Sequence, residues 1–297
     1  MIYTPKQQAA GREMYDHLAE QQVLALMETL RRHDENWRAH QLMSEVCPYF
    51  LRDRPAIKQA AAECRQNVLH LIDPAEYEAY YGSNPNERPF EEQFGGLSIE
   101  DADRIPRVGW LRERLGEHRA RLGHRLAVLD FGCNDGWMLA HLEHHGIADL
   151  ERSIGIDLNP ACVTRARERG VKAFEGSVEE PVTTGAPFDA VTCFEVLEHV
   201  KDPVDVLMEA RIAIAGPEAR DGRVYFSTPL GAVEGGLIDW ATREAKGHVR
   251  AVTPDDVGAW LDAAGLELVT DSPDGGDPIL LTLDADGLML VEAKAAA

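Results

Sequence analysis

One stretch, residues 128–142 (VLDFGCNDGWMLAHL), constrains the fold more than any other part of the sequence. An apolar run over residues 126–129 ends at Asp130, a turn with glycines follows, and apolar residues then recur with helical spacing. This order predicts a buried strand, a tight turn and the start of a helix. Gly132 and Gly136 would let the backbone pass close to a ligand, where a side chain would collide with it.

A second buried run, residues 153–157 (SIGID), ends at Asp157, which comes 21 residues after Gly136. In a nucleotide-binding βαβ unit, an acid at the end of the second strand binds the ribose hydroxyls of the ligand. The spacing therefore predicts a nucleotide-type ligand at the glycine turn.

From residue 126 onward, strand patterns alternate with helix patterns, which predicts a parallel sheet covered by helices. The expected strands are residues 126–130, 153–157, 172–174, 190–194, 223–227, 266–270 and 288–294, with a terminal hairpin at 278–287. The expected helices are residues 105–122, 136–145, one that begins at Asn159 and Pro160, 204–214, and one from Thr253 and Pro254 to 264. Asn159 and Thr253 are predicted N-caps, and Gly265 is a predicted C-cap.

The first part of the chain has a different pattern. Residues 1–72 carry apolar side chains at helical spacing in three segments, and residues 73–108 mix turn formers with aromatics. We therefore expect two domains: 1–108, a helical cap followed by a lid or linker, and 109–297, the ligand-binding domain. The second and third helical segments also resemble one tetratricopeptide-type hairpin, but a single pair does not make a repeat array. The aromatics of the linker could line an acceptor pocket or seal the joint between the two domains.

The glycine turn (D-F-G-C-N-D-G) followed by G-I-D resembles the ligand-binding motifs of class I S-adenosylmethionine (SAM)-dependent methyltransferases. Residues 188–200 (FDAVTCFEVLEHV) resemble the fourth-strand region of the ubiquinone-biosynthesis O-methyltransferases and their relatives. The resemblance covers roughly residues 126–294. It implies a Rossmann-like seven-stranded sheet with helices on both faces, and SAM as the cofactor.

The resemblance also implies roles for individual residues. Asp130 and Gly132 would approach the methionine portion of SAM, Asp157 would bind the ribose, and Val178 would pack on the adenine. Many relatives carry an acid at the position of Ser177, so this residue departs from the family pattern. For Asp157 the alternative is an ordinary helix-capping acid. The candidate donor-binding residues are Asp130, Gly132, Cys133, Asn134, Gly136, Asp157, Leu158, Ser177, Val178 and Glu195.

The cluster Glu195-x-x-Glu198-His199 is the strongest indication of mechanism. On a helical turn the three side chains would share one face, and two carboxylates with an imidazole favour a divalent metal such as Mg²⁺, Mn²⁺ or Zn²⁺. By resemblance to the ubiquinone-pathway enzymes and the small-RNA 3′-end 2′-O-methyltransferases, His248 would complete the ligand set. Glu195, His199 and His248 are then the candidate catalytic residues. Many metal-free relatives share E-x-x-E-H, with the histidine acting as a base or held structurally.

A hydroxyl is a poor nucleophile at neutral pH, and a bound metal would lower its pKa. The expected activity is therefore metal-assisted O-methylation of a small molecule or sugar. The alternatives are a metal-independent methyltransferase, an RNA 2′-O-methyltransferase and a non-catalytic scaffold. The formal net charge of −21 disfavours nucleic acid, although residues 107–125 are rich in arginine.

The remaining expectations concern the environment of the chain. Five cysteines without a C-x-x-C pair suit reduced thiols in the cytoplasm, and no apolar run is long enough to span a membrane. The N-terminal helices are a candidate surface for self-association. The histidines of residues 141–145 (HLEHH) are expected on a solvated helix face.

Overall fold

The computed structural model describes residues 88–179, 187–215, 221–229, 252, 254–269 and 288–296. The chain divides into two compact units, and nearly all described residues belong to the one formed by Pro74–Pro229 and Pro254–Ala297. Several predicted features lie outside the described residues: the N-terminal helices, the linker aromatics Tyr77, Tyr80 and Tyr81, Thr253, His248 and the hairpin at 278–287. The predicted domain boundary at residue 108 stays a prediction.

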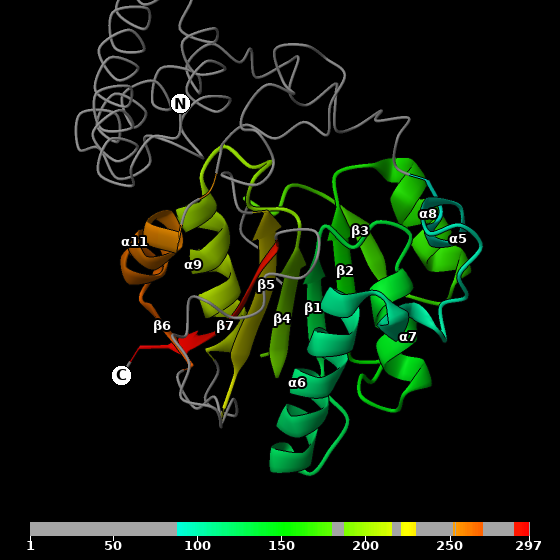
Figure 1. Cartoon of the computed structure of the whole chain (residues 1–297), viewed down its shortest axis with the longest axis horizontal. Helices are drawn as coiled ribbons and strands as arrows, with labels where there is room; N and C mark the ends of the chain where they lie inside the picture. Colours follow the sequence, from blue (N-terminus) through cyan, green and yellow to red (C-terminus); the bar gives the residue numbers. More distant parts are fainter. Residues whose placement is uncertain are drawn as a thin grey trace, which may run out of the picture. The chain divides into compact units, whose positions relative to one another are not determined.

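A seven-stranded sheet with the order β3-β2-β1-β4-β5-β7-β6 forms the centre of this unit (Figure 1). The strands are β1 (Val128–Phe131), β2 (Ile154–Asp157), β3 (Ala173–Glu175), β4 (Ala190–Phe194), β5 (Arg223–Pro229), β6 (Leu266–Leu268) and β7 (Leu288–Ala295). β1 to β5 pair in parallel, whereas β7 runs antiparallel between β5 and β6. The chain leaves β1 towards β2 on one side and later returns to β4 on the other, so the strand order reverses beside β1.

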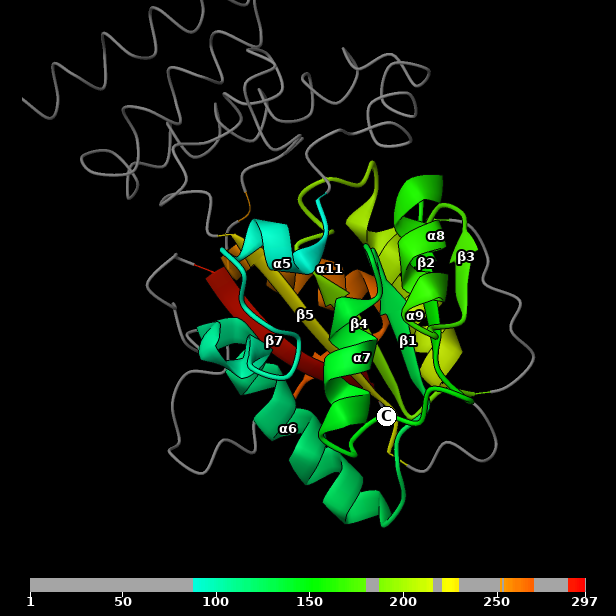
Figure 2. The same ribbon diagram turned by 90° about the vertical axis from the view of Figure 1, so that its right-hand side faces the viewer.

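Helices cover both faces of the sheet, as Figures 1 and 2 show. One face carries α6 (Pro106–Leu122), α7 (Trp137–His144) and α8 (Pro160–Glu168), and the other carries α9 (Pro203–Ile214) and α11 (Pro254–Ala264). The short helix α5 (Phe90–Gln93) and a 3-10 turn, Ala102–Arg104, precede α6. The Rossmann-like α/β fold predicted from the sequence is therefore confirmed.

Local sequence signals explain where several helices begin and end. Asn159 caps α8 by accepting a hydrogen bond from the Ala161 N–H at 2.9 Å, with Pro160 in the first turn. Asp202 caps α9 in the same way through Val204 N–H at 2.8 Å. Gly265, which follows α11, has φ of +69° as predicted for a C-cap.

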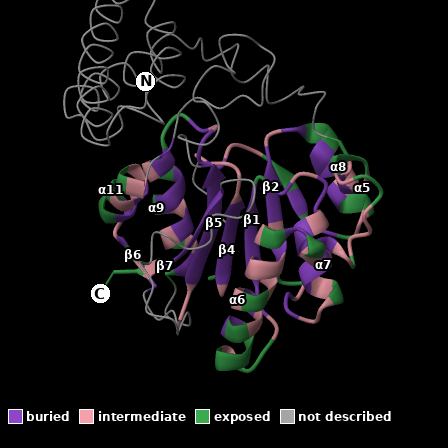
Figure 3. Ribbon diagram, viewed as in Figure 1, coloured by how far each residue is buried: buried purple, intermediate pink, exposed green. Residues whose placement is uncertain are grey.

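The sheet is buried along its central strands, whereas the helices present one buried stripe each (Figure 3). In α6 the stripe is Val108, Leu111, Leu115 and His118, at helical spacing. The solvated face expected for the α7 histidines is wrong for His141. Its side chain is fully buried, and its Nδ1 lies 2.7 Å from the carbonyl oxygen of Ile99, because the segment before α6 packs over this turn.

Candidate functional site

The glycine loop, residues 132–136, connects β1 to α7 at the carboxyl edge of the sheet. Gly132 and Gly136 have φ of +69° and +74°, and Asn134 has +48°, so three of its five residues are left-handed. A Cβ on Gly132 would come within 2.5 Å of Val196 Cγ2, and one on Gly136 within 3.0 Å of Ala166 and Val171 side-chain atoms. The glycines are therefore required by packing inside the protein, in addition to any approach of a ligand.

Asp157, the last residue of β2, has both carboxylate oxygens engaged by the backbone. Its Oδ2 accepts a hydrogen bond from Asn134 N–H at 2.8 Å, and its Oδ1 accepts one from Asn159 N–H at 2.9 Å. Burial raises the pKa of this carboxyl, and the two backbone hydrogen bonds oppose that rise. Asp157 therefore fixes the glycine loop and the start of α8 at once. Each oxygen keeps a lone pair that a ligand hydroxyl could use.

Asn134 supplies a test of whether a nucleoside donor fits here. Its side-chain Oδ1 is buried and has no hydrogen-bond partner in the part of the chain that the structure describes. A buried acceptor without a partner costs free energy unless a ligand or water supplies a donor. SAM offers ribose hydroxyls and an ammonium group, so the residues present fit it.

Asp130 lies in β1 next to the glycine loop and is almost fully buried. Its Oδ1 accepts a hydrogen bond from Thr192 Oγ1 of β4 at 2.6 Å. Burial raises the pKa of Asp130 to about 7, although the Thr192 hydrogen bond acts in the opposite direction. The neighbouring Cys133 is buried as well, and burial raises the pKa of its thiol, which keeps it protonated.

The end of β3 comes to the same edge. Gly176 N–H donates to the carbonyl oxygen of Asp157 at 3.1 Å, so the segment after β3 is tied to the end of β2. Ser177 Oγ accepts from Glu179 N–H at 3.2 Å, and Val178 is buried. Leu158, directly after β2, is half-buried. All the described candidate donor-binding residues therefore meet at the carboxyl ends of β1, β2, β3 and β4.

The E-x-x-E-H segment differs from its prediction. It is an irregular turn rather than a helical one, and Glu195 has φ of +55°. The Glu195 N–H donates to the carbonyl and hydroxyl oxygens of Ser227, both at 3.1 Å. Glu198 is fully buried and accepts a hydrogen bond from Thr228 Oγ1 at 3.1 Å. His199 Nε2 lies 4.0 Å from Glu198 Oε1. The helical turn expected for Glu195, Glu198 and His199 is therefore wrong.

Arg107, which the sequence marks only as part of an arginine-rich segment, reaches Glu195 from the first turn of α6. Its Nε lies 2.7 Å from Glu195 Oε1, and its guanidinium stacks over the Phe94 ring at 5.7 Å. One local feature could have indicated Arg107 as a site residue. It directly follows Pro106, at the start of the helix that precedes β1. Nothing local to Glu195 indicated this long-range pair.

These contacts do not fit the predicted metal site. Among the described residues no group of three or more histidine, cysteine, aspartate or glutamate side chains could hold a metal ion. Glu195 is bound by Arg107, and Glu198 is directed into the core towards Thr228. The fourth predicted ligand, His248, lies outside the described residues.

A mostly parallel sheet with a glycine turn after β1 and an acid at the end of β2 defines a nucleotide-binding α/β protein, and the antiparallel β7 completes a seven-stranded sheet. Residues 102–271 match the model of the methyltransferase domain family, and the chain belongs to this family. It is 30% identical over 176 residues to the ubiquinone biosynthesis O-methyltransferase of Pseudomonas aeruginosa (strain LESB58), covering 54% of this chain and 71% of the relative. The ubiquinone biosynthesis O-methyltransferase of Azotobacter vinelandii is 31% identical over 178 residues, with the same coverage of both chains.

Two solved structures share the fold. The magnesium protoporphyrin IX methyltransferase of Synechocystis PCC 6803 with bound SAM has a TM-score of 0.50 at 15% identity, covering 76% of this chain and 98% of that one. The plantazolicin methyltransferase in complex with SAH has a TM-score of 0.52 at 12% identity, covering 80% and 99%. The protein is a SAM-dependent methyltransferase. None of the described helices is long and apolar enough to cross a membrane.

Proposed function

We propose that this protein transfers the methyl group of SAM to a hydroxyl oxygen of a small molecule or sugar. The observation that supports this most is the similarity to ubiquinone biosynthesis O-methyltransferases over the region that carries the candidate site. The formal net charge of −21 favours a small acceptor over RNA, because an acidic surface repels a phosphate backbone.

SAM supplies an already activated methyl group on a sulfonium. In this proposal Asp157 and the Asn134 amide oxygen accept hydrogen bonds from the ribose hydroxyls or the ammonium group, and Val178 packs against the adenine. Arg107 offers a guanidinium to the donor's carboxylate at the same edge. Its pairing with Glu195 keeps that arginine directed towards the site before the donor arrives.

His199 is the candidate base. It is partly exposed on the turn after β4, with the buried carboxylate of Glu198 4.0 Å behind it. The acceptor oxygen attacks the methyl carbon in line with the C–S bond, which breaks and leaves its electron pair on sulfur to give S-adenosylhomocysteine (SAH). His199 takes the hydroxyl proton, and Glu198 stabilises the resulting imidazolium. Alignment of the two reactants can supply about 7–11 kcal/mol in favourable cases.

Metal assistance is the second form of this proposal. E-x-x-E-H in the sequence favours it, but the contacts of Glu195 and Glu198 do not, so no step above passes through a metal. EDTA treatment with verified metal removal, followed by metal add-back, separates the two forms. We expect full activity after the metal is removed. Activity that is lost with the metal and returns only on metal add-back would favour the metal-assisted form instead.

The activity itself is tested with labelled SAM and a panel of catechols, phenols and sugars, alongside amines and an RNA oligonucleotide. We expect a labelled ether product. His199→Gln should lower kcat by about 100-fold or more, the lower range for loss of a general base, and remove the acidic limb of the pH–rate profile. Labelling of the amines or RNA alone would overturn O-methylation of a small acceptor. An unchanged pH–rate profile in His199→Gln would mean that His199 is not the general base.

A further inference from the structure

Asp135 belongs to the glycine loop, yet its side chain contacts Phe90 and Arg169, which are not among the residues assigned to the donor. The carboxylate is fully buried. Its Oδ2 accepts a hydrogen bond from Phe90 N–H at 3.0 Å and lies 2.6 Å from Arg169 Nη2. Phe90 belongs to the strap, which we define as residues 88–97, and Arg169 directly follows α8.

Arg169 binds the strap as well. Its Nη1 and Nη2 contact the two carboxylate oxygens of Glu91 at 3.0 and 2.7 Å, a bidentate pair, and this hydrogen bonding lowers the pKa of Glu91. One guanidinium thus joins a loop residue to a strap residue across the end of α8. Because Asp135 is buried, removing its charge would leave both Arg169 and the Phe90 N–H without their partner.

The aromatic residues of the strap contact the site at two places. Phe90 is buried and stacks on Trp137, the residue after the glycine loop, with ring centroids 4.7 Å apart. Phe94 lies under the guanidinium of Arg107, which pairs with Glu195 after β4. The strap therefore holds the glycine loop at one end of the site and Arg107 at the other.

We infer that Asp135 is a positioning residue for the methyl donor. It binds the strap directly through Phe90 and indirectly through Arg169 and Glu91. The bound strap then holds the glycine loop and Arg107 in the donor-binding geometry. Asp135 does not touch the donor in this arrangement. Since strap docking and donor binding favour the same loop geometry, each strengthens the other. The inference rests on SAM binding at the glycine loop, and it deepens that proposal.

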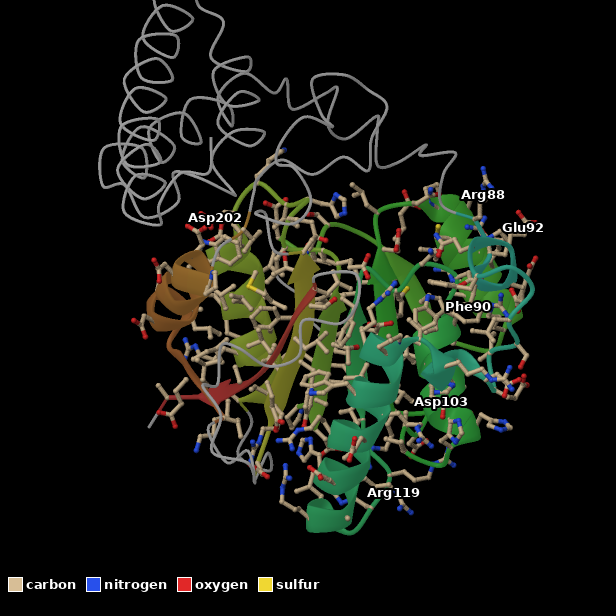
Figure 4. The ribbon with its side chains drawn as sticks, viewed as in Figure 1. Arg88, Phe90, Glu92, Asp103, Arg119 and Asp202 are labelled. Carbon is tan, nitrogen blue, oxygen red and sulfur yellow. The ribbon has the colours of Figure 1, made fainter. Side chains whose placement is uncertain are left out.

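The test uses the full chain and SAH as the probe. Glu91→Gln keeps the shape of a half-exposed side chain and removes the bidentate pair, and Asp135→Asn removes the buried charge. We expect SAH to bind at least about tenfold more weakly to Asp135→Asn, the range for loss of a hydrogen bond to a charged group. For Glu91→Gln we expect about three- to tenfold weaker binding, because this pair is half-exposed and its Gln variant keeps a hydrogen-bonding group. The KM of the acceptor should not change. Glu92→Gln, at an exposed neighbouring position of the same helix, is the matched control and should bind like wild type (Figure 4).

Hydrogen exchange supplies a readout that a merely structural role would not change. In wild type, SAH should slow exchange of the Phe90 amide and its strap neighbours, and in Glu91→Gln this slowing should be reduced. Wild-type affinity for SAH in Glu91→Gln, with the same ligand-induced protection, would overturn the inference even if Asp135→Asn fails to fold. Absence of SAH binding to the wild-type protein would instead overturn the donor assignment itself.

Discussion

A sequence pattern presents two roles for Asp157 as alternatives. The motif resemblance predicts a ribose-binding acid, and the position before Asn159 predicts a capping acid. Its hydrogen bonds to the Asn134 and Asn159 N–H groups give it the structural role. These bonds also hold the loop that a donor would contact, and they leave lone pairs on both oxygens. The structural role is therefore compatible with the proposed binding role.

Asp157→Ala should weaken SAM binding by about 1.5–3 kcal/mol, the range for a hydrogen bond to a charged group. It should also lower stability, because the Asn134 and Asn159 N–H groups lose their acceptors. Isothermal titration with SAM measures the first effect and chemical denaturation the second. Asp205→Asn, an exposed acid on α9, is the control for loss of one charge. Unchanged SAM affinity in Asp157→Ala would mean that this carboxylate does not meet the donor.

At the scale of elements, the two turns at the site depend on each other. Gly132 in the first turn lies against Val196 in the second, so the loop after β1 and the turn after β4 fit together only without a Cβ on Gly132. Gly132 also has φ of +69°, which a residue with a side chain adopts at a cost. Two separable penalties are therefore expected from one substitution.

Gly132→Ala should lose about 1–2 kcal/mol of unfolding free energy to the backbone conformation and about 1–3 kcal/mol to the clash with Val196. Adding Val196→Ala should recover the second part only. Gly146→Ala is the matched control, because Gly146 has φ of +66° and no atom within 4 Å of an added Cβ. Denaturant unfolding of the four proteins measures both parts. A Gly132→Ala protein no less stable than Gly146→Ala would contradict the clash.

The sequence predicted regular elements better than it predicted the site. Alternating apolar runs, Asn159 with Pro160, and Gly265 are local signals, and the strands and helices they predict occur within a few residues of their expected bounds. The prediction of a helical turn at E-x-x-E-H was wrong because Glu195 has long-range partners. Its N–H binds Ser227 of the neighbouring strand, and its carboxylate pairs with Arg107 of α6. Helical spacing in a short segment carries no information about such long-range partners. The strap contacts of Asp135 were missed for the same reason.

At the scale of the whole unit, α6 is joined to the sheet by buried charges. Glu292 of β7 binds Arg114 of α6 at 2.6 Å and Arg223 of β5 at 2.9 Å. Next to Glu292, the hydroxyl oxygen of Tyr225 lies 3.2 Å from Nδ1 of the buried His118. Burial lowers the pKa of His118 to about 4, and nearby arginines add to this. On the same sheet burial raises the pKa of Asp130 to about 7.

These two groups should make opposite contributions to the pH dependence of stability. His118 binds its proton less well in the folded protein than in the unfolded one. Its contribution to the free energy of unfolding is therefore fully present above pH 6.5 and falls by about 3 kcal/mol as pH drops towards 4. Asp130 holds its proton more tightly in the folded protein than in the unfolded one. Its contribution to the free energy of unfolding is therefore fully present below pH 3.8 and falls by about 4 kcal/mol as pH rises towards 7. Between about pH 4 and 6.5 the two slopes therefore largely cancel.

Single substitutions should separate these slopes. Both His118→Asn and Asp130→Asn keep a hydrogen-bonding group and remove the titration. Relative to wild type, His118→Asn should gain stability as pH falls from 6.5 to 4, because it escapes the cost of protonating a buried imidazole. Asp130→Asn should gain stability relative to wild type as pH rises from 4 to 7, because it escapes the cost of a buried carboxylate. Urea unfolding at half-unit pH steps, without ligand, measures both differences, and other titrating groups cancel in each comparison. Parallel pH curves for wild type and either variant would mean that the corresponding side chain is solvated in the folded protein.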